Sequence, residues 1–126
     1  MKNLIKIGTV ESINYKNGTA RLLYEELDNS LSFDLPIIAN EYNMPNVGDQ
    51  VVAIFLSQDN LQGFIVGRPF SDDNMPSNGK ENIIRKDYDE DNFIEYDKNT
   101  ETLTINVKQI VINGNLVQGG RVDGSR

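Results

Sequence analysis

Apolar and polar residues alternate along most of this chain, in short runs separated by turn-forming residues. A period of two is typical of a β-strand with one face in a core and the other in water. No segment shows a sustained helical period, and the best helix candidate, residues 37–47, is interrupted by Pro45. The pattern therefore predicts an all-β protein. The strand-like runs before residue 71 cover residues 5–15, 19–24, 31–37, 50–56 and 63–69.

Turn signals separate these runs. Asn17 and Gly18 both tolerate positive φ, and they predict a tight hairpin turn between the first two strands. Gly8 falls where the first run changes phase, as a residue at a β-bulge would. The run 50–56, which is apolar throughout after Gln50, predicts a strand that is buried on both faces. Five short strands with glycine at the bends predict a small barrel in residues 1–70. Periodicity leaves an OB-fold-like barrel and an SH3-like barrel open.

The rest of the chain has a different character. Residues 71–81 begin with a polar stretch rich in turn formers and predict a linker. Residues 82–115 predict three or four more short strands, with a turn at residues 97–101 and a phase slip at residues 108–109. Residues 116–126 form a Gly-containing tail. The apolar positions of the second strand segment that alternate are Ile94, Tyr96, Leu103, Ile105, Val107, Ile110 and Ile112.

This second segment has too few apolar residues to build a core of its own. A lone hairpin is marginal in water, and its open edges would invite aggregation. Two arrangements would cover its apolar residues. The segment packs as an annex on the barrel of its own chain, or three copies wind their strands around a common axis into a β-prism. In the second arrangement the alternating apolar residues point inward, and the phase slip marks a corner.

Composition narrows the possible functions. The chain has 126 residues, 12 basic and 19 acidic residues, and a net charge of -7. An acidic chain repels the phosphate backbone, so nucleic acid is not an expected partner. There is no cysteine and no histidine, which excludes disulfides, thiolate metal sites and a histidine base. No signal peptide or membrane-spanning run is present, so we expect synthesis and folding in the cytoplasm.

An acidic stretch raises the question of a metal site. Asp87, Asp89 and Asp91 match the first, third and fifth ligand positions of a calcium-binding EF-hand loop. However, Asn92 stands where that loop needs glycine, and Lys98 stands where it needs a bidentate glutamate. No helices are predicted on either side. We therefore interpret this stretch as a solvated loop and expect no metal and no cofactor.

Catalysis is not expected either. The carboxylate pairs Glu25–Glu26 and Asp72–Asp73 are adjacent in sequence, and neighbouring strand residues point to opposite faces, so neither pair converges on one substrate. No phosphate-binding loop or nucleophile–base arrangement is present, and we predict that the chain is not an enzyme. Five aromatic residues could stack on single-stranded nucleic acid, but their strand positions place most of them in the core. They are Tyr15, Tyr24, Phe33, Phe55 and Phe64.

Two motifs occur in a specific order. A Pro-x-Val-Gly-Asp-x-Val entry into a hydrophobic strand is followed by a strand ending in Val-Gly-Arg and by an acidic linker with proline. This order and spacing resemble the barrel domain of the phage baseplate assembly protein V family, and residues 93–105 resemble the start of that family's β-helical needle. The resemblance spans residues 4–115. The motif residues are Pro45, Val47, Gly48, Asp49, Val51, Val66, Gly67, Arg68, Asp72, Asp73 and Pro76.

The resemblance implies a central spike protein of a contractile tail baseplate, from a phage, a tail-like bacteriocin (tailocin) or a related secretion device. Such a protein is a homotrimer and a structural component of the virion or particle. Its OB-type barrels form a collar beneath the tail hub protein, and its interwound β-helix pierces the target cell envelope when the sheath contracts. The turns of the barrel would be set by Asn17, Gly18, Pro45, Gly48, Asp49, Gly67 and Arg68.

The chain departs from this family in two respects. Many members end in an apex where histidines from three chains bind iron, and a chain without histidine cannot form that site. The needle is also short, so we expect either a separate small tip protein that caps it or an apex without metal. Residues 116–126 would bind such a cap or fray as a free terminus. The alternative function is a small OB-fold module that binds single-stranded nucleic acid or a protein.

Overall fold

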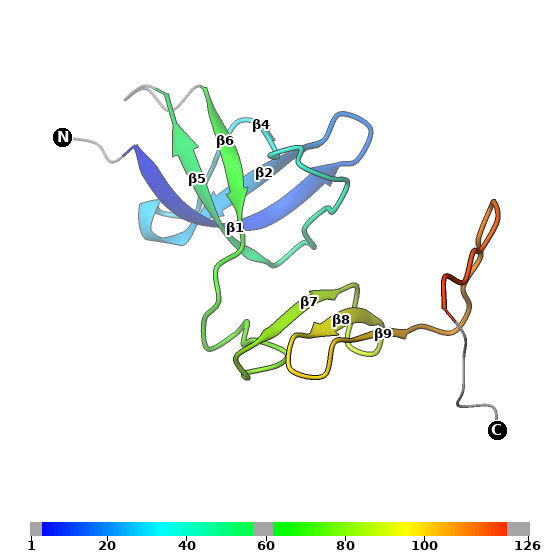
Figure 1. Cartoon of the computed structure of the whole chain (residues 1–126). Coiled ribbons are helices and arrows are strands. Elements are labelled where there is room, and N and C mark those ends of the chain that lie inside the picture. Colours follow the sequence, from blue (N-terminus) through cyan, green and yellow to red (C-terminus); the bar gives the residue numbers. More distant parts are fainter. Residues whose placement is uncertain (1–3, 57–61, 121–126) are drawn as a thin grey trace. The chain divides into compact units, whose positions relative to one another are not determined.

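The structure is a computed structural model that describes residues 4–56 and 62–120. The chain divides into two compact units, residues 1–75 and 76–126, and the boundary falls within the expected linker. Each unit contains one antiparallel sheet (Figure 1). The described residues contain strands and one short 3₁₀ turn but no α-helix, so the predicted all-β class is confirmed.

The first sheet is built around a long bent strand, β1, which pairs with β2 on one side and with β5 on the other. The strands lie in the order β3-β2-β1-β5-β6, and β4 also pairs with β2. The 3₁₀ turn Glu25–Leu27 follows β2. The bounds are β1 Ile5–Asn14, β2 Thr19–Tyr24, β3 Ser30–Leu31, β4 Leu35–Pro36, β5 Gln50–Phe55 and β6 Gly63–Gly67.

One contact links the segment after β4 to β6, on the other side of the sheet. Ile37, directly after β4, forms a single parallel bridge with Ile65 of β6. The backbone N–H of Ile38 donates a hydrogen bond to the Ile65 carbonyl at 3.0 Å. Apart from this bridge, no ladder joins β4 to β6 in the described part of the chain, so the sheet does not close into a regular barrel.

The core of the first unit lies on one face of the sheet. Alternate residues of β2 and β5 point into it, as the period-two pattern predicted. Gly8 lets the strands approach closely, because a Cβ atom there would lie 3.0 Å from the Leu22 Cβ atom and from a Tyr24 ring carbon. The buried residues are Val10, Ala20, Leu22, Tyr24, Leu35, Val51, Ala53, Phe55 and Ile65.

Gly8 is therefore not the bulge residue that the sequence suggested. The register between β1 and β2 shifts between Val10 and Ser12, so the extra residue is Glu11. At Gly8 the β1–β5 pairing continues without a break, with Gly8 opposite Val51. The missing side chain at Gly8 serves packing against β2, and the local twist comes from the bulge farther along β1.

The expected strand at residues 31–37 is interrupted. It forms the two short strands β3 and β4, and Phe33 between them is 62% exposed instead of buried. The Ser32 hydroxyl accepts a hydrogen bond from the Leu22 N–H at 2.8 Å and donates one to the Phe33 carbonyl at 2.7 Å. These side-chain bonds replace part of the regular ladder, and Pro36 has no N–H to extend it.

The run 50–56 is buried on one face only, which corrects the prediction of burial on both faces. Val51, Ala53 and Phe55 face the core, whereas Ile54 and Leu56 are exposed. A purely apolar run specifies that a strand forms but not which of its faces is covered. The apolar side chains of Ile54 and Leu56 therefore lie on a face of β5 that the core does not cover.

The second sheet is a three-stranded meander in the order β7-β8-β9. Its strands are β7 Ile83–Asp87, β8 Phe93–Asp97 and β9 Thr102–Asn106. The turn after β8 falls where the sequence predicted it, and Glu101 closes it with a φ of 54°. Residues 110–112 form no strand in the described chain, so the predicted return of a strand there is wrong.

Candidate functional site: the uncovered sheet faces

The second sheet has one face made of four aliphatic residues, one tyrosine and one lysine. The register pairs Ile84 with Tyr96 and Tyr96 with Leu103, which forms one row across the sheet. A second row joins Lys86, Ile94 and Ile105. Because side chains alternate between faces along a strand, both rows lie on the same face. The meander face is defined here by Ile84, Ile94, Tyr96, Leu103 and Ile105.

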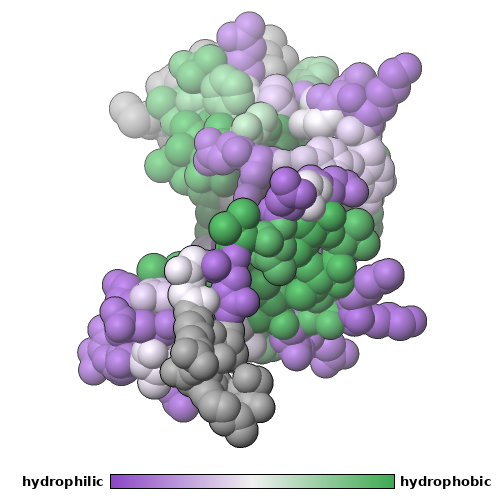
Figure 2. Space-filling view, turned by 45° about the vertical axis from the view of Figure 1, so that its right-hand side comes forward, coloured by the Kyte–Doolittle hydropathy of each residue, from purple (hydrophilic) through white to green (hydrophobic). Residues whose placement is uncertain are grey.

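The side chains of the meander face are left largely open. Ile84 is 60% exposed, Leu103 59% and Ile105 45%, while Ile94 and Tyr96 are half-buried. Broad areas of hydrophobic residues are visible on the molecular surface in the space-filling view (Figure 2). Contiguous exposed apolar surface in a soluble protein marks an interaction site. The meander face is therefore the principal candidate site of this chain.

The opposite face of the same sheet is mixed, because it carries Ile83 and Phe93 beside a charged cluster centred on Arg85. Arg85 donates hydrogen bonds to Asp87 and to Glu95, each at 2.9 Å, and its guanidinium lies 3.6 Å from the centre of the Phe93 ring. Asn78 also donates to Glu95, at 2.8 Å. The two faces therefore differ, because this one carries a hydrogen-bonded charge cluster and the meander face does not.

These contacts shift the acidity of the two carboxyl groups. The hydrogen bond from Arg85, with that from Asn78, lowers the pKa of Glu95. The hydrogen bond from Ser77, followed by the contact with Arg85, lowers the pKa of Asp87. Carboxylates with a lowered pKa contribute stability above the pKa that they have in the unfolded chain. That contribution is lost as the pH falls through the folded pKa.

The second sheet is accordingly expected to lose stability between about pH 5 and pH 3. Glu95→Gln should flatten this dependence, because the amide does not titrate. The measurement is the thermal midpoint, followed by circular dichroism across that pH range. Glu90→Gln, which changes an exposed residue of the β7–β8 loop, is the matched control and should leave the slope unchanged. Equal slopes for the Glu95→Gln variant and the unchanged chain would contradict the assignment.

The residues predicted as inward rows of a needle are only partly brought together. Four of the seven lie on the meander face. Val107 follows β9 and is half-buried, while Ile110 and Ile112 lie beyond the sheet and are more than half exposed. Sequence reasoning missed Ile84, because it follows another isoleucine and interrupts the clean alternation. Only the pairing of β7 with β8, which sets Ile84 opposite Tyr96, shows that Ile84 belongs to this face.

A second apolar face lies on the first sheet, on the side opposite its core. One row across β1, β5 and β6 joins Ile5, Ile54 and Phe64. In the next row Ile7 lies beside Val52. Val66 adjoins this row, where the register between β5 and β6 shifts by one residue. None of these six side chains carries a charge. Sequence reasoning missed this outer face, because it assigned the run 50–56 to the interior. The outer face is the second candidate interaction surface.

Five of the seven predicted turn residues, all except Asn17 and Gly18, lie at one corner of the first unit. Gly48 adopts a φ of 96°, and its N–H donates to the Val10 carbonyl at 2.8 Å. The Asp49 carboxylate accepts the Asn46 N–H at 2.8 Å and lies 3.8 Å from Arg68 Nε. Pro45, Asp49, Gly67 and Arg68 line one shallow groove. These contacts position the start of β5.

The hairpin turn after β1 differs in detail from the prediction. The loop spans residues 15–18, and Gly18 alone has positive φ, at 69°, while Asn17 does not. The Gly18 N–H donates to the Asn14 carbonyl at 2.9 Å. The turn is therefore a longer loop closed by glycine and not a two-residue turn of the type that Asn-Gly favours most strongly.

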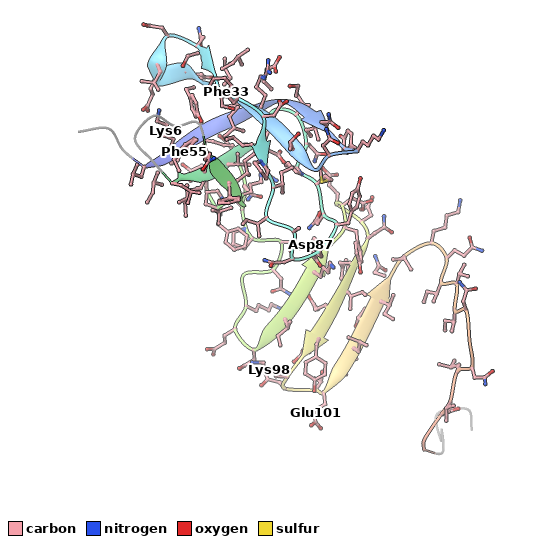
Figure 3. All side chains as sticks on the ribbon, turned by 90° about the horizontal axis from the view of Figure 1, so that it is seen from above. Lys6, Phe33, Phe55, Asp87, Lys98 and Glu101 are labelled. Carbon is pink, nitrogen blue, oxygen red and sulfur yellow. The ribbon has the colours of Figure 1, made fainter. Side chains whose placement is uncertain are left out.

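The acidic loop between β7 and β8 uses its carboxylates internally. Asp89 accepts the backbone N–H groups of Asp91 and Asn92 at 3.0 and 2.9 Å, and these bonds lower the pKa of Asp89. Asp87 lies at the start of this loop, at the end of the sheet away from Lys98 and Glu101 (Figure 3). No group of three acidic residues in the described ranges is arranged to hold a metal ion.

The aromatic residues do not form one platform. Tyr24 and Phe55 are buried, and the Lys6 ammonium lies 5.1 and 5.8 Å from the centres of their rings. Burial raises the pKa of the Tyr24 hydroxyl. Tyr15, Phe33 and Phe64 are exposed, so the expectation that most of the five aromatic residues belong to the core is wrong. No helix in the described residues is long and apolar enough to cross a membrane.

Together these observations define an all-β protein with two antiparallel sheets, each of which leaves an apolar face open. No protein-family model matches the chain, and no curated protein matches it.

Proposed function

We propose that the chain is the central spike protein of a contractile tail baseplate, in a phage, a tailocin or a related injection system. It acts as a homotrimer without catalytic activity. The first unit forms a collar under the tail hub, and the second unit contributes strands to an interwound spike. When the sheath contracts, the spike pierces the envelope of the target cell. The protein is assembled in the host cytoplasm and resides in the particle.

The single observation that carries this proposal is the meander face. Its five defining residues lie in two rows on a sheet whose other face carries the ion pairs of Arg85 with Asp87 and Glu95. Three copies around an axis would bury these five residues against one another, with Lys86 left at the β7 end of the second row, on the edge of the sheet. Their edge strands β7 and β9 would also find partners, which removes the open edges that promote aggregation. The mechanical force on the spike during sheath contraction would then be spread over the backbone hydrogen bonds between chains.

The connectivity of the first unit supports an OB-type collar. Starting from β6, the contacts run through β5, β1 and β2 to β4, and the parallel bridge between Ile37 and Ile65 leads back to β6. A five-stranded, partly open barrel has this kind of near-closure. The outer face on β1, β5 and β6 gives such a collar an uncharged surface for the neighbouring proteins of a baseplate.

The molar mass of the purified chain in solution tests the proposal. Light scattering at low micromolar concentration should give three times the chain mass of 14.2 kDa, and the value should persist on dilution. A single-chain mass would contradict the proposal and would favour the arrangement in which residues 82–115 pack on their own barrel. The binding-module alternative would then be tested with single-stranded oligonucleotides, for which Phe33 and Phe64 offer exposed rings.

A further inference from the structure

Asn-Gly pairs are chemically unstable in proteins, and this chain has three of them. They are Asn17-Gly18, Asn78-Gly79 and Asn113-Gly114. In deamidation the backbone nitrogen of the glycine loses its proton and attacks the asparagine Cγ atom. A new N–Cγ bond forms, the Cγ–Nδ2 bond breaks, and ammonia leaves. Water then opens the cyclic succinimide to aspartate or isoaspartate. The glycine nitrogen must therefore be free, and the asparagine side chain must be able to turn toward it.

At Asn17 the attacking nitrogen is already engaged. The Gly18 N–H donates to the Asn14 carbonyl at 2.9 Å, and the Asn17 N–H donates to Asn14 Oδ1 at 3.1 Å. The loop is also anchored on both sides by the ladder between β1 and β2. Deamidation at Asn17 requires this loop to open first, which lowers its rate by the free energy of opening.

At Asn78 the side chain itself is held. Its Nδ2 atom donates to Glu95 Oε1 at 2.8 Å, and its Oδ1 atom accepts the Lys80 N–H at 3.0 Å. The side chain cannot turn toward the Gly79 nitrogen until both bonds break. Deamidation at Asn78 is consequently also coupled to a local opening.

At Asn113 neither restraint is present. Asn113 and Gly114 lie exposed at a bend beyond β9, and no hydrogen bond joins either residue to another described residue. No heavy atom beyond the neighbouring residues lies within 4 Å of the position that a Cβ atom would take on Gly114. No hydrogen bond or packed neighbour therefore opposes rotation of the side chain and the following peptide into the reactive geometry.

We infer that Asn113 is a modification site, deamidated spontaneously in the folded protein well before Asn17 and Asn78. The product carries one additional negative charge directly after Ile112. In the isoaspartate form the backbone also gains one carbon, which changes the alternation of any strand that includes residues 110–114. This inference goes beyond the spike proposal and rests on the exposure of Asn113 in the single chain.

The test follows all three sites in the full chain, incubated in mildly alkaline buffer with and without a denaturing concentration of urea. Peptide mapping by mass spectrometry measures amide-to-acid conversion, and enzymatic methylation detects isoaspartate. Without urea, conversion at Asn113 should be at least about tenfold faster than at the other two sites, the factor set by an opening free energy of about 1.4 kcal/mol. In urea the three rates should become similar.

Two variants separate the causes. Gly114→Ala should slow conversion at Asn113, because the added methyl group hinders the attack, and should leave Asn78 unchanged. Glu95→Ala should accelerate conversion at Asn78, since it removes one of the two bonds that hold that side chain. If Asn113 stays an amide in the folded chain while it converts in urea, or if all three sites convert equally without urea, the inference is overturned. Measuring the molar mass of the same sample keeps this outcome separate from the spike proposal.

Discussion

Replacing Ile105 with lysine is expected to convert the proposed trimer into single chains. Ile105 lies beside Ile94 on the meander face, and in an interwound spike three copies of it would approach a common axis. Three ammonium groups would then be buried without partners, at an effective penalty of several kcal/mol for each ion. Light scattering should report one chain mass for the variant at concentrations where the unchanged protein has three.

Thr104→Lys is the matched control for this experiment. Thr104 is the neighbouring residue in β9, points to the opposite face and lies beside Glu95, so a lysine there meets water and a carboxylate. This variant should keep the trimer mass. A trimer that survives Ile105→Lys, with an unchanged thermal midpoint, would show that the meander face is not the interface. Equal loss of the trimer in both variants would point to damage to β9 as a whole.

Leu22→Ala is expected to destabilise the first unit by about 3 kcal/mol, within the range of 2–5 kcal/mol observed for large-to-small substitutions in cores. Leu22 is fully buried, at 0% exposure, in the centre of the core that β2 and β5 share. Its removal loses hydrophobic burial and leaves a cavity that the surrounding strands fill only in part. Urea unfolding, followed by circular dichroism, measures the change.

Leu23→Ala serves as the control for Leu22→Ala. Leu23 is the next residue of the same strand, has the same side chain and points away from the core, where it is only half-buried. Its loss should cost well under half as much. If the two variants were equally destabilised, the assignment of inner and outer faces in β2 would be wrong, because a one-residue change of register exchanges the faces.

Alternation along the sequence was a good guide where each strand has one clear face. It predicted the all-β class, the positions of β2, β8 and β9, and the common face of Tyr96 and Leu103. It failed where side chains compete with the backbone for hydrogen bonds. The run that contains Phe33 reads as one strand, yet the Ser32 hydroxyl takes the Leu22 N–H and the strand divides.

The candidate site was harder to predict than the fold, because whether a strand's side chains are exposed depends on which other parts of the protein cover that face of the sheet. Residues 51–56 are apolar at both odd and even positions, and that composition is compatible with complete burial. Only the pairing with β1 and β6 shows that Ile54 and Phe64 share an open surface. In the same way, Ile84 joins the meander face through the β7–β8 register, which no local pattern encodes.

The bridge between Ile37 and Ile65 also bears on how the chain folds. Its two residues are far apart in the sequence, and all of β5 lies between them, so a long loop must close before the contact forms. The meander of β7, β8 and β9 pairs only sequence neighbours, which form quickly. A small sheet with one uncovered apolar face is nevertheless marginal alone. The meander is therefore expected to form first but only transiently. The first unit forms more slowly, yet it is the first of the two to stay folded.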